Sequence, residues 1–170
     1  MSARDRLIAE LRAHALVLGD VVLTSGATAS YYVDAKRAIL RPAGFRALAE
    51  LVAGYARQWE ATAVGGLTMG ADVKAFFVRK EAKAHGLQRR IEGPLLDAED
   101  RCLVVEDVVT TGGSTLLAID ALHEAGHELV GVVSVLDRLA GGAARIEEAA
   151  RAPYVALATI DDVYPERPDR

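Results

Sequence analysis

Two adjacent acids, Glu106 and Asp107, stand near the end of an aliphatic run in "CLVVEDVVTTGGST", residues 102–115. The run predicts a buried strand, and acids at the carboxyl end of a parallel strand lie where open α/β sheets bind ligands. A loop of hydroxyl residues and glycines follows and opens a predicted helix at residues 114–125. Backbone N–H groups freed by glycines, together with hydroxyls and a helix amino terminus, can hold a monophosphate.

The acids and the loop need different partners. Carboxylates repel a phosphate, so the acids require neutral hydroxyls or a cation such as Mg²⁺. A ribose 5-phosphate satisfies both, with its phosphate in the loop and its 2- and 3-hydroxyls on the acids. The alternative is a strand end followed by a simple helix cap from Thr111 or Ser114, but the fixed order of aliphatics, acids and "TTGGS" favours the ligand site. The residues predicted here to bind the donor of such a group are Glu106, Asp107, Val108, Val109, Thr110, Thr111, Gly112, Gly113 and Ser114.

A second cluster of charge lies upstream. Arg79, Lys80, Lys83 and His85 fall within seven residues, at the end of the predicted strand "KAFFVRK" and just after it. Such a run is usually a solvated face, but about twenty residues without clear periodicity follow it, and loops of that length are usually functional. We therefore expect a mobile lid at about residues 81–99 that neutralises a charged leaving group and excludes water.

The rest of the sequence predicts one α/β domain over residues 1–170, with a hood at about 1–40 and a core at about 42–165. Aliphatic strands alternate with helices, which indicates a mainly parallel sheet covered on both faces. The expected strands are "ATAVGGL", "KAFFVRK", "RCLVVEDVV", "ELVGVVSVLD" and "YVALATI", and the expected helices cover residues 4–18, 42–59, 114–125 and 143–151. Ser2 and Asp5 are candidate caps of the first helix.

Composition excludes several classes of function. The net charge of −4 and a pI near 5.6 argue against a nucleic-acid-binding surface. No apolar run approaches membrane-spanning length. The lone Cys102 lies in an aliphatic run, which predicts a buried thiol and a reducing, cytoplasmic setting. His14, His123 and His127 are predicted to be structural or solvent-facing.

One connection is unusually short. Only "TMGADV" separates "ATAVGGL" from "KAFFVRK", whereas adjacent parallel strands need a crossover of about a dozen residues or more. Either the two strands are not adjacent parallel partners, or a crossover helix is missing between Asp72 and Val73.

These motifs resemble those of a known family. "CLVVEDVVTTGGST" resembles the phosphoribosyl-diphosphate signature of the type I phosphoribosyltransferases. "VRKEAKAHG", "LTSGATASYYVDAK" and "VLDRLAGG" are similar to motifs of the members that use orotate, and the likeness covers essentially the whole chain. It implies the type I fold and Mg²⁺-dependent transfer of a 5-phosphoribosyl group from its 1-diphosphate to orotate. It also implies a homodimer with shared active sites.

The resemblance implies roles for individual residues. The catalytic set is Lys83, His85, Glu106 and Asp107, with Lys83 and His85 reaching the neighbouring subunit's site. Contacts to the donor's diphosphate come from Arg79, Lys80, Lys83 and His85. Orotate contacts come from Thr110, Arg138, Tyr31 and Tyr32. Mg²⁺ is expected to bridge the donor's diphosphate and ribose hydroxyls without a direct protein ligand.

Some alternatives stay open. Arg138 could instead be a surface residue paired with Asp137, and one of the two tyrosines should belong to the core because adjacent strand residues face opposite ways. Thr24 stands where some members of the family have a lysine, so Lys36 could supply that contact. Two competing functions remain: a type I phosphoribosyltransferase that acts on another base, and a regulator that binds the donor without turning it over.

Overall fold

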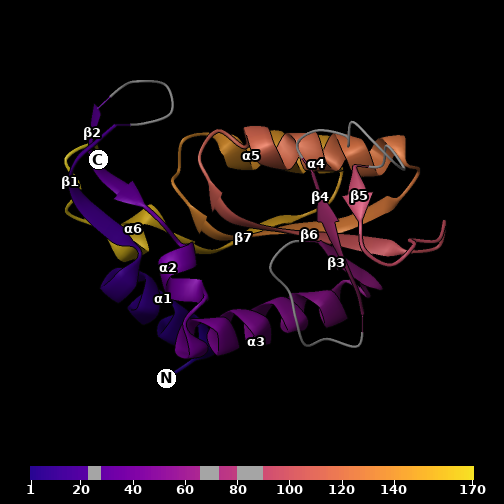
Figure 1. Ribbon diagram of the computed structural model, residues 1–170, viewed down its shortest axis with the longest axis horizontal. Coiled ribbons are helices and arrows are strands. Elements are labelled where there is room, and N and C mark those ends of the chain that lie inside the picture. Colours follow the sequence, from indigo (N-terminus) through magenta and orange to yellow (C-terminus); the bar gives the residue numbers. More distant parts are fainter. Residues whose placement is uncertain (23–27, 66–72, 80–89) are drawn as a thin grey trace.

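The structure is a computed structural model that describes residues 1–22, 28–65, 73–79 and 90–170. Its centre is a six-stranded sheet with the order β5-β4-β3-β6-β7-β8 (Figure 1). All neighbouring pairs are parallel except β4 and β5, which confirms the prediction of a mainly parallel sheet. The strands are β3 (Ala63–Gly65), β4 (Lys74–Val78), β5 (Ile91–Glu92), β6 (Arg101–Val109), β7 (Glu128–Asp137) and β8 (Tyr154–Thr159).

The strand order reverses between β3 and β6. From β3 the chain continues to one side, through β4 and β5, and from β6 it continues to the other side, through β7 and β8. Ligands of open α/β sheets bind at such a reversal, outside the carboxyl ends of the strands. β3 ends at Gly65 and β6 ends at Val109, so the two predicted acids lie close to this position.

Helices cover both faces of the sheet. α3 covers one face, and α4 and α5 cover the other (Figure 1). Leu48 and Val52 of α3 belong to one buried cluster, and Ile119 of α4 and Ile146 of α5 belong to a second. Each helix presents apolar residues at helical spacing towards the sheet. The bounds are α3 (Pro42–Gln58), α4 (Gly113–Glu124) and α5 (Gly142–Ala150), close to those predicted.

The predicted hood, residues 1–40, contains α1 (Ala3–His14), β1 (Leu16–Val22), β2 (Thr28–Val33) and α2 (Lys36–Ile39). From the other end of the chain, α6 (Ile160–Val163) contacts α1. Ser2 and Asp5 form the predicted cap of α1, as a reciprocal capping box. The prediction that this helix continues to residue 18 is wrong, because Leu16 already pairs with Val33 in the antiparallel β1–β2 ribbon. The β-branched Val17 near the start of β1 favours the strand.

The short connection joins neighbouring strands. β3 and β4 are adjacent and parallel, with Ala63 opposite Lys74, so the alternative that they are not adjacent parallel partners is wrong. Residues 66–72 lie outside the described residues. The loss of a crossover helix between Asp72 and Val73 therefore stays a prediction.

The predicted lid is described only from residue 90 onward. There β5 pairs antiparallel with β4, an element that the sequence did not predict. Lys74 Nζ lies 2.8 Å from Asp97 Oδ2 and 2.7 Å from Asp100 Oδ2. Residues 91–100 are thus attached to the edge of the sheet by strand pairing and by ion pairs.

Other predictions concern single residues. Cys102 is fully buried, as expected, and burial raises the pKa of its thiol to about 12. His14 lies 3.8 Å from Glu10, and His123 is exposed on α4. Among the described helices, none combines the length and apolarity that crossing a membrane requires.

Candidate active site

Glu106 and Asp107 lie on opposite sides of β6. Glu106 Oε2 accepts hydrogen bonds from the hydroxyls of Ser114 and Thr115, both at 3.0 Å, so this acid faces α4. Asp107 instead forms an ion pair with Lys36, which belongs to the hood. Successive residues of a strand face opposite ways, and the acidic pair therefore connects two halves of the site.

The two acids differ in their protonation equilibria. Burial raises the pKa of Glu106, and the neighbouring Asp107 carboxylate raises it further. Burial would also raise the pKa of Asp107, but the hydrogen bond and charge of Lys36, together with hydrogen bonds from Glu106 and the Val108 N–H, lower that pKa below its usual value. The environment thus favours ionisation of Asp107 and makes Glu106 harder to ionise than a free glutamate, and opposite pKa shifts of this kind are common in functional pairs.

The loop after β6 leaves a helix amino terminus open. Gly112, at φ +81°, precedes the first turn of α4, and within the described part of the chain no side chain caps that turn. The simple capping role considered for Thr111 or Ser114 is therefore wrong, since the Ser114 hydroxyl donates to Glu106 instead. Free N–H groups and the helix dipole make such a terminus suitable for an anion.

Contacts from α5 hold this loop in place. Arg145 donates to the carbonyl oxygen of Thr111 at 2.9 Å. A Cβ at Gly142 would lie 2.7 Å from the carbonyl oxygen of Thr110, so only glycine permits this close approach. The loop is therefore positioned by packing as well as by its own glycines.

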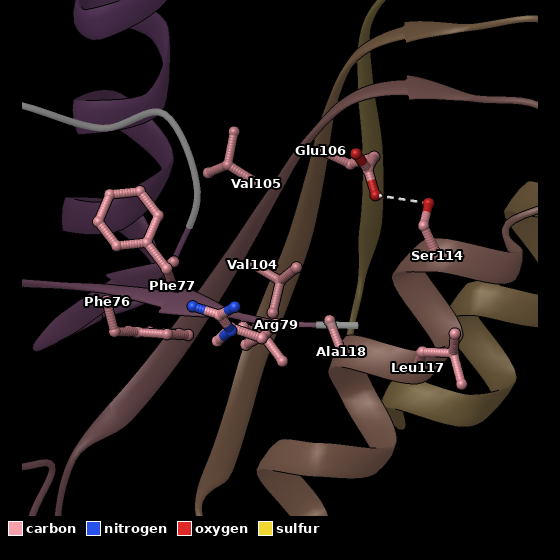
Figure 2. Close-up of a pocket in the computed structure, with 11 residues that line it drawn as sticks. Phe76, Phe77, Arg79, Val104, Val105, Glu106, Ser114, Leu117 and Ala118 are labelled. Atoms are coloured by element: carbon pink, nitrogen blue, oxygen red, sulfur yellow. Dashed lines mark hydrogen bonds between the residues drawn. The ribbon is translucent and has the colours of Figure 1, made fainter. Parts of the chain in front are cut away.

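A pocket opens beside Glu106 (Figure 2). Glu106 and Ser114 border it from β6 and α4, while Phe76 and Arg79 border it from β4 and its end. Arg79 Nη1 lies 3.2 Å from Glu92 Oε1, with half of its side chain exposed. Arg79 is thus the one predicted lid cation that the described residues include, and it lines the same pocket as Glu106 and Ser114.

A second pocket opens beside Asp107. It is lined by Tyr32, Lys36, Asp107, Thr110 and Arg138 together with neighbouring backbone. Tyr32 is 43% exposed whereas Tyr31 is only 3% exposed, so the prediction that one tyrosine belongs to the core is confirmed. The structure thus brings three of the four predicted orotate contacts to one pocket, and places the fourth behind it.

Arg138 is positioned by Tyr31, a residue of β2 in the hood. Its Nη2 donates to the Tyr31 hydroxyl at 3.0 Å, and its guanidinium carbon lies 5.1 Å from the centre of the Tyr31 ring. The alternative that Arg138 pairs with Asp137 is wrong, because Asp137 is buried and accepts from the Leu139 N–H and the Tyr154 hydroxyl. Arg138 therefore extends along an aromatic face towards the pocket.

Sequence reasoning missed two side chains of this site. Thr115 donates to Glu106, and Asp169 accepts from the Tyr31 hydroxyl. The position of Thr115, in the first turn of the helix that follows the acids, is a usable signal, whereas nothing in the sequence marks Asp169. The predicted contacts at Lys80, Lys83 and His85 lie outside the described residues, and so does Thr24, which stands where some members of the family have a lysine.

Comparison with known proteins assigns the chain to a family. The family profile described as phosphoribosyl transferase domain matches residues 61–153. Orotate phosphoribosyltransferase of Corynebacterium glutamicum is 44% identical over 176 aligned positions, which cover 96% of this chain and 95% of the relative. The alignment is longer than the 170 residues of this chain, so the relative contains residues that have no counterpart here.

Solved structures agree with that assignment. The crystal structure of Mycobacterium tuberculosis orotate phosphoribosyltransferase with Fe(III) dicitrate has a TM-score of 0.82 at 38% identity, and covers 95% of this chain and 99% of that one. The complex of the same enzyme with 5-phospho-α-D-ribosyl 1-diphosphate has a TM-score of 0.77 at 33% identity, with 95% and 98% covered. The acids, the open helix terminus and these relatives together show that the chain belongs to the phosphoribosyltransferase family, among the orotate phosphoribosyltransferases.

Proposed function

We propose that this protein transfers the 5-phosphoribosyl group of 5-phosphoribosyl 1-diphosphate to orotate, giving orotidine 5′-phosphate and diphosphate. One observation carries the proposal: the uncapped amino terminus of α4 and the acids of β6 meet at the strand reversal, beside a pocket that contains Arg138. These groups suit a phosphate, ribose hydroxyls and a carboxylate. The reaction belongs to pyrimidine nucleotide synthesis.

The donor's 5-phosphate would bind the loop of residues 110–114, where no side chain caps the first N–H groups of α4 in the described part of the chain. Its ribose hydroxyls would contact the acids, since Asp107 is ionised and can accept hydrogen bonds. As the bond from C1 to the diphosphate breaks, positive charge develops on the ribose. The carboxylate of Asp107 stabilises that charge electrostatically.

Orotate supplies the attacking atom, its own ring nitrogen N1, so no protein nucleophile is needed. Its carboxylate matches the forked guanidinium of Arg138, which can donate two parallel hydrogen bonds. Tyr32 and Thr110 line the same pocket and would border the ring. Catalysis then depends on holding N1 in line with C1, and on stabilising the charge that forms.

The leaving diphosphate requires cations. Arg79 lies at the pocket beside Glu106 and is available from one side. We propose that Lys80, Lys83 and His85 complete the set from the lid, with Lys83 and His85 acting on the partner subunit's site in a homodimer. Lys36 supplies a further cation close to Asp107, in place of the lysine that some relatives have at the position of Thr24.

Mg²⁺ fits this site as a partner of the donor. Diphosphate and ribose oxygens are hard ligands that Mg²⁺ prefers, and it usually binds with substrate phosphates and few carboxylates. Neither acid is expected to ligate the ion directly, since Glu106 Oε2 already accepts from two hydroxyls and Asp107 is paired with Lys36. When bound, the ion would neutralise charge on the diphosphate. We further propose a cytoplasmic location, in keeping with a single buried cysteine.

A steady-state assay tests the function directly. Diphosphate release from the donor should require orotate and Mg²⁺, and should be much slower with adenine, hypoxanthine or uracil. Release with another base at an equal rate would overturn the substrate assignment. Donor binding without any base-dependent release would indicate a regulator instead.

Mixing two inactive variants tests the shared site. Lys83→Ala and Asp107→Asn homodimers should each be impaired, and mixing should restore part of the activity through hybrid dimers that contain one intact site. No recovery after demonstrated subunit exchange would show that the lid acts within its own subunit.

A further inference from the structure

The C-terminal segment places an acid beside the residue proposed to receive orotate. Asp169 Oδ2 lies 4.0 Å from Arg138 Nη2, although the two residues are far apart in the sequence. Figure 1 shows the C-terminus next to β1 and β2, on the side of the hood. Arg138 therefore has a carboxylate neighbour from its own chain.

Tyr31 links the two charged groups. Its hydroxyl accepts from Arg138 at 3.0 Å and donates its single proton to the carboxylate of Asp169, whose two oxygens lie at 3.0 and 2.9 Å. Its ring also packs edge-on against Tyr164, with centroids 5.4 Å apart. Tyr31 thus connects the C-terminal segment to Arg138 through hydrogen bonds on both sides of its hydroxyl.

The segment is itself anchored near this point. Arg167, which is nearly buried, pairs with Asp161 and lies 3.4 Å from Asp169. Asp169 is more exposed, at 54%. An anchored segment with a half-exposed carboxylate near its end can keep that group close to Arg138 and still release it at small cost.

We propose that Asp169 is an intramolecular substitute for the carboxylate of the substrate, and that orotate binds by displacing it from Arg138. The proposal rests on the proposed function, in which Arg138 receives the orotate carboxylate. Asp169 then keeps the guanidinium positioned and paired between turnovers. It also raises the orotate concentration needed for half-saturation, because the two carboxylates compete for one guanidinium.

Charge removal at position 169 tests the competition. Asp169→Asn keeps an oxygen that can accept from Tyr31 but removes the negative charge. We expect the KM for orotate to fall about two- to fivefold, the range of an exposed ion pair, while kcat and the KM for the donor stay unchanged. Asp169→Glu, which keeps the charge, should resemble the wild type.

Glu166→Gln is the matched control. Glu166 is exposed on the same segment, so this change removes one unit of charge without removing the carboxylate next to Arg138. A KM for orotate that falls equally in Glu166→Gln and Asp169→Asn would overturn the proposal in favour of a general charge effect. An unchanged or raised KM in Asp169→Asn would overturn it too.

A measurement without turnover separates this inference from the proposed function. Orotate binding, measured by calorimetry with the donor site filled by ribose 5-phosphate and diphosphate, should be tighter in Asp169→Asn than in the wild type. If the wild type turns over orotate but the variant binds it no more tightly, only the competition is refuted. If the wild type neither binds nor turns over orotate, the proposed function fails, and this inference fails with it.

Discussion

Replacing Lys36 by methionine removes the cation from Asp107 while it keeps the length and apolar stem of the side chain. The Lys36 side chain is 59% exposed and that of Asp107 is 18% exposed. Because one partner is mostly solvated, losing the pair should lower the free energy of unfolding by about 0–1 kcal/mol. Breaking a fully buried pair would cost about 3–5 kcal/mol.

The effect on donor binding should be larger than the effect on stability. A hydrogen bond to a charged group contributes about 1.5–3 kcal/mol, and exposure of Lys36 reduces this to about 1–2 kcal/mol. The KM for the donor should then rise by about 5–30-fold. Steady-state kinetics at saturating orotate measure this value, and urea unfolding measures the stability of the same preparation.

The pH dependence adds a second test. Lys36 holds the pKa of Asp107 below its usual value against the opposing effect of burial. Without Lys36 that pKa rises, so the acidic limb of kcat/KM for the donor should move to higher pH. Asp107 in the wild type contributes stability above its unfolded pKa and loses it as pH falls, so the stability difference between the two proteins should be largest at neutral pH and shrink in acid.

Arg37→Met is the matched control, because Arg37 is exposed on the same short helix α2 and has no ion pair among the described residues. A KM for the donor that rises equally in both variants would refute a specific role for Lys36. An unchanged KM in Lys36→Met would refute the proposed contact with the donor.

Three further predictions concern the acids and the loop. Thr115→Val removes a hydroxyl that lowers the pKa of Glu106, so the acidic limb of kcat/KM should move to higher pH, and an unmoved limb in a pH–rate profile would contradict this. Burial alone would raise the pKa of Asp100, but its hydrogen bonds, among them the one from Lys74, lower that pKa to about 2. Asp100→Asn should therefore lower the free energy of unfolding by about 1–2 kcal/mol at neutral pH. This loss of stability should vanish as pH falls from about 4 to 2. Denaturant titrations of wild type and variant over this range measure it, and a difference that does not change with pH would contradict the prediction. Gly112→Ala places a Cβ 3.1 Å from Ile146 at φ +81°, and should cost about 1–2 kcal/mol by thermal unfolding together with weaker donor binding; equal stability would show that the loop adapts.

Local patterns predicted the core of the fold because each of its elements carries its own signal. β6, α4 and β7 were predicted almost to the residue, since aliphatic runs, glycine turns and helical periodicity are properties of neighbouring residues. β5 was missed because a two-residue strand has no period and exists only through its pairing with β4. The end of α1 was misplaced because β1 forms only when β2 is there to pair with it.

The sequence by itself determined the chemistry of the site: two acids at a strand end, a glycine-rich phosphate loop and a basic cluster, all within continuous motifs. The tertiary structure decided which partner each side chain has. It turned Glu106 towards α4 and Asp107 towards Lys36, buried Tyr31 while exposing Tyr32, and brought Asp169 to Tyr31 across 138 positions of sequence. Such contacts depend on how the hood packs against the sheet, and that packing sums many weak contacts between distant residues, which no local spacing encodes.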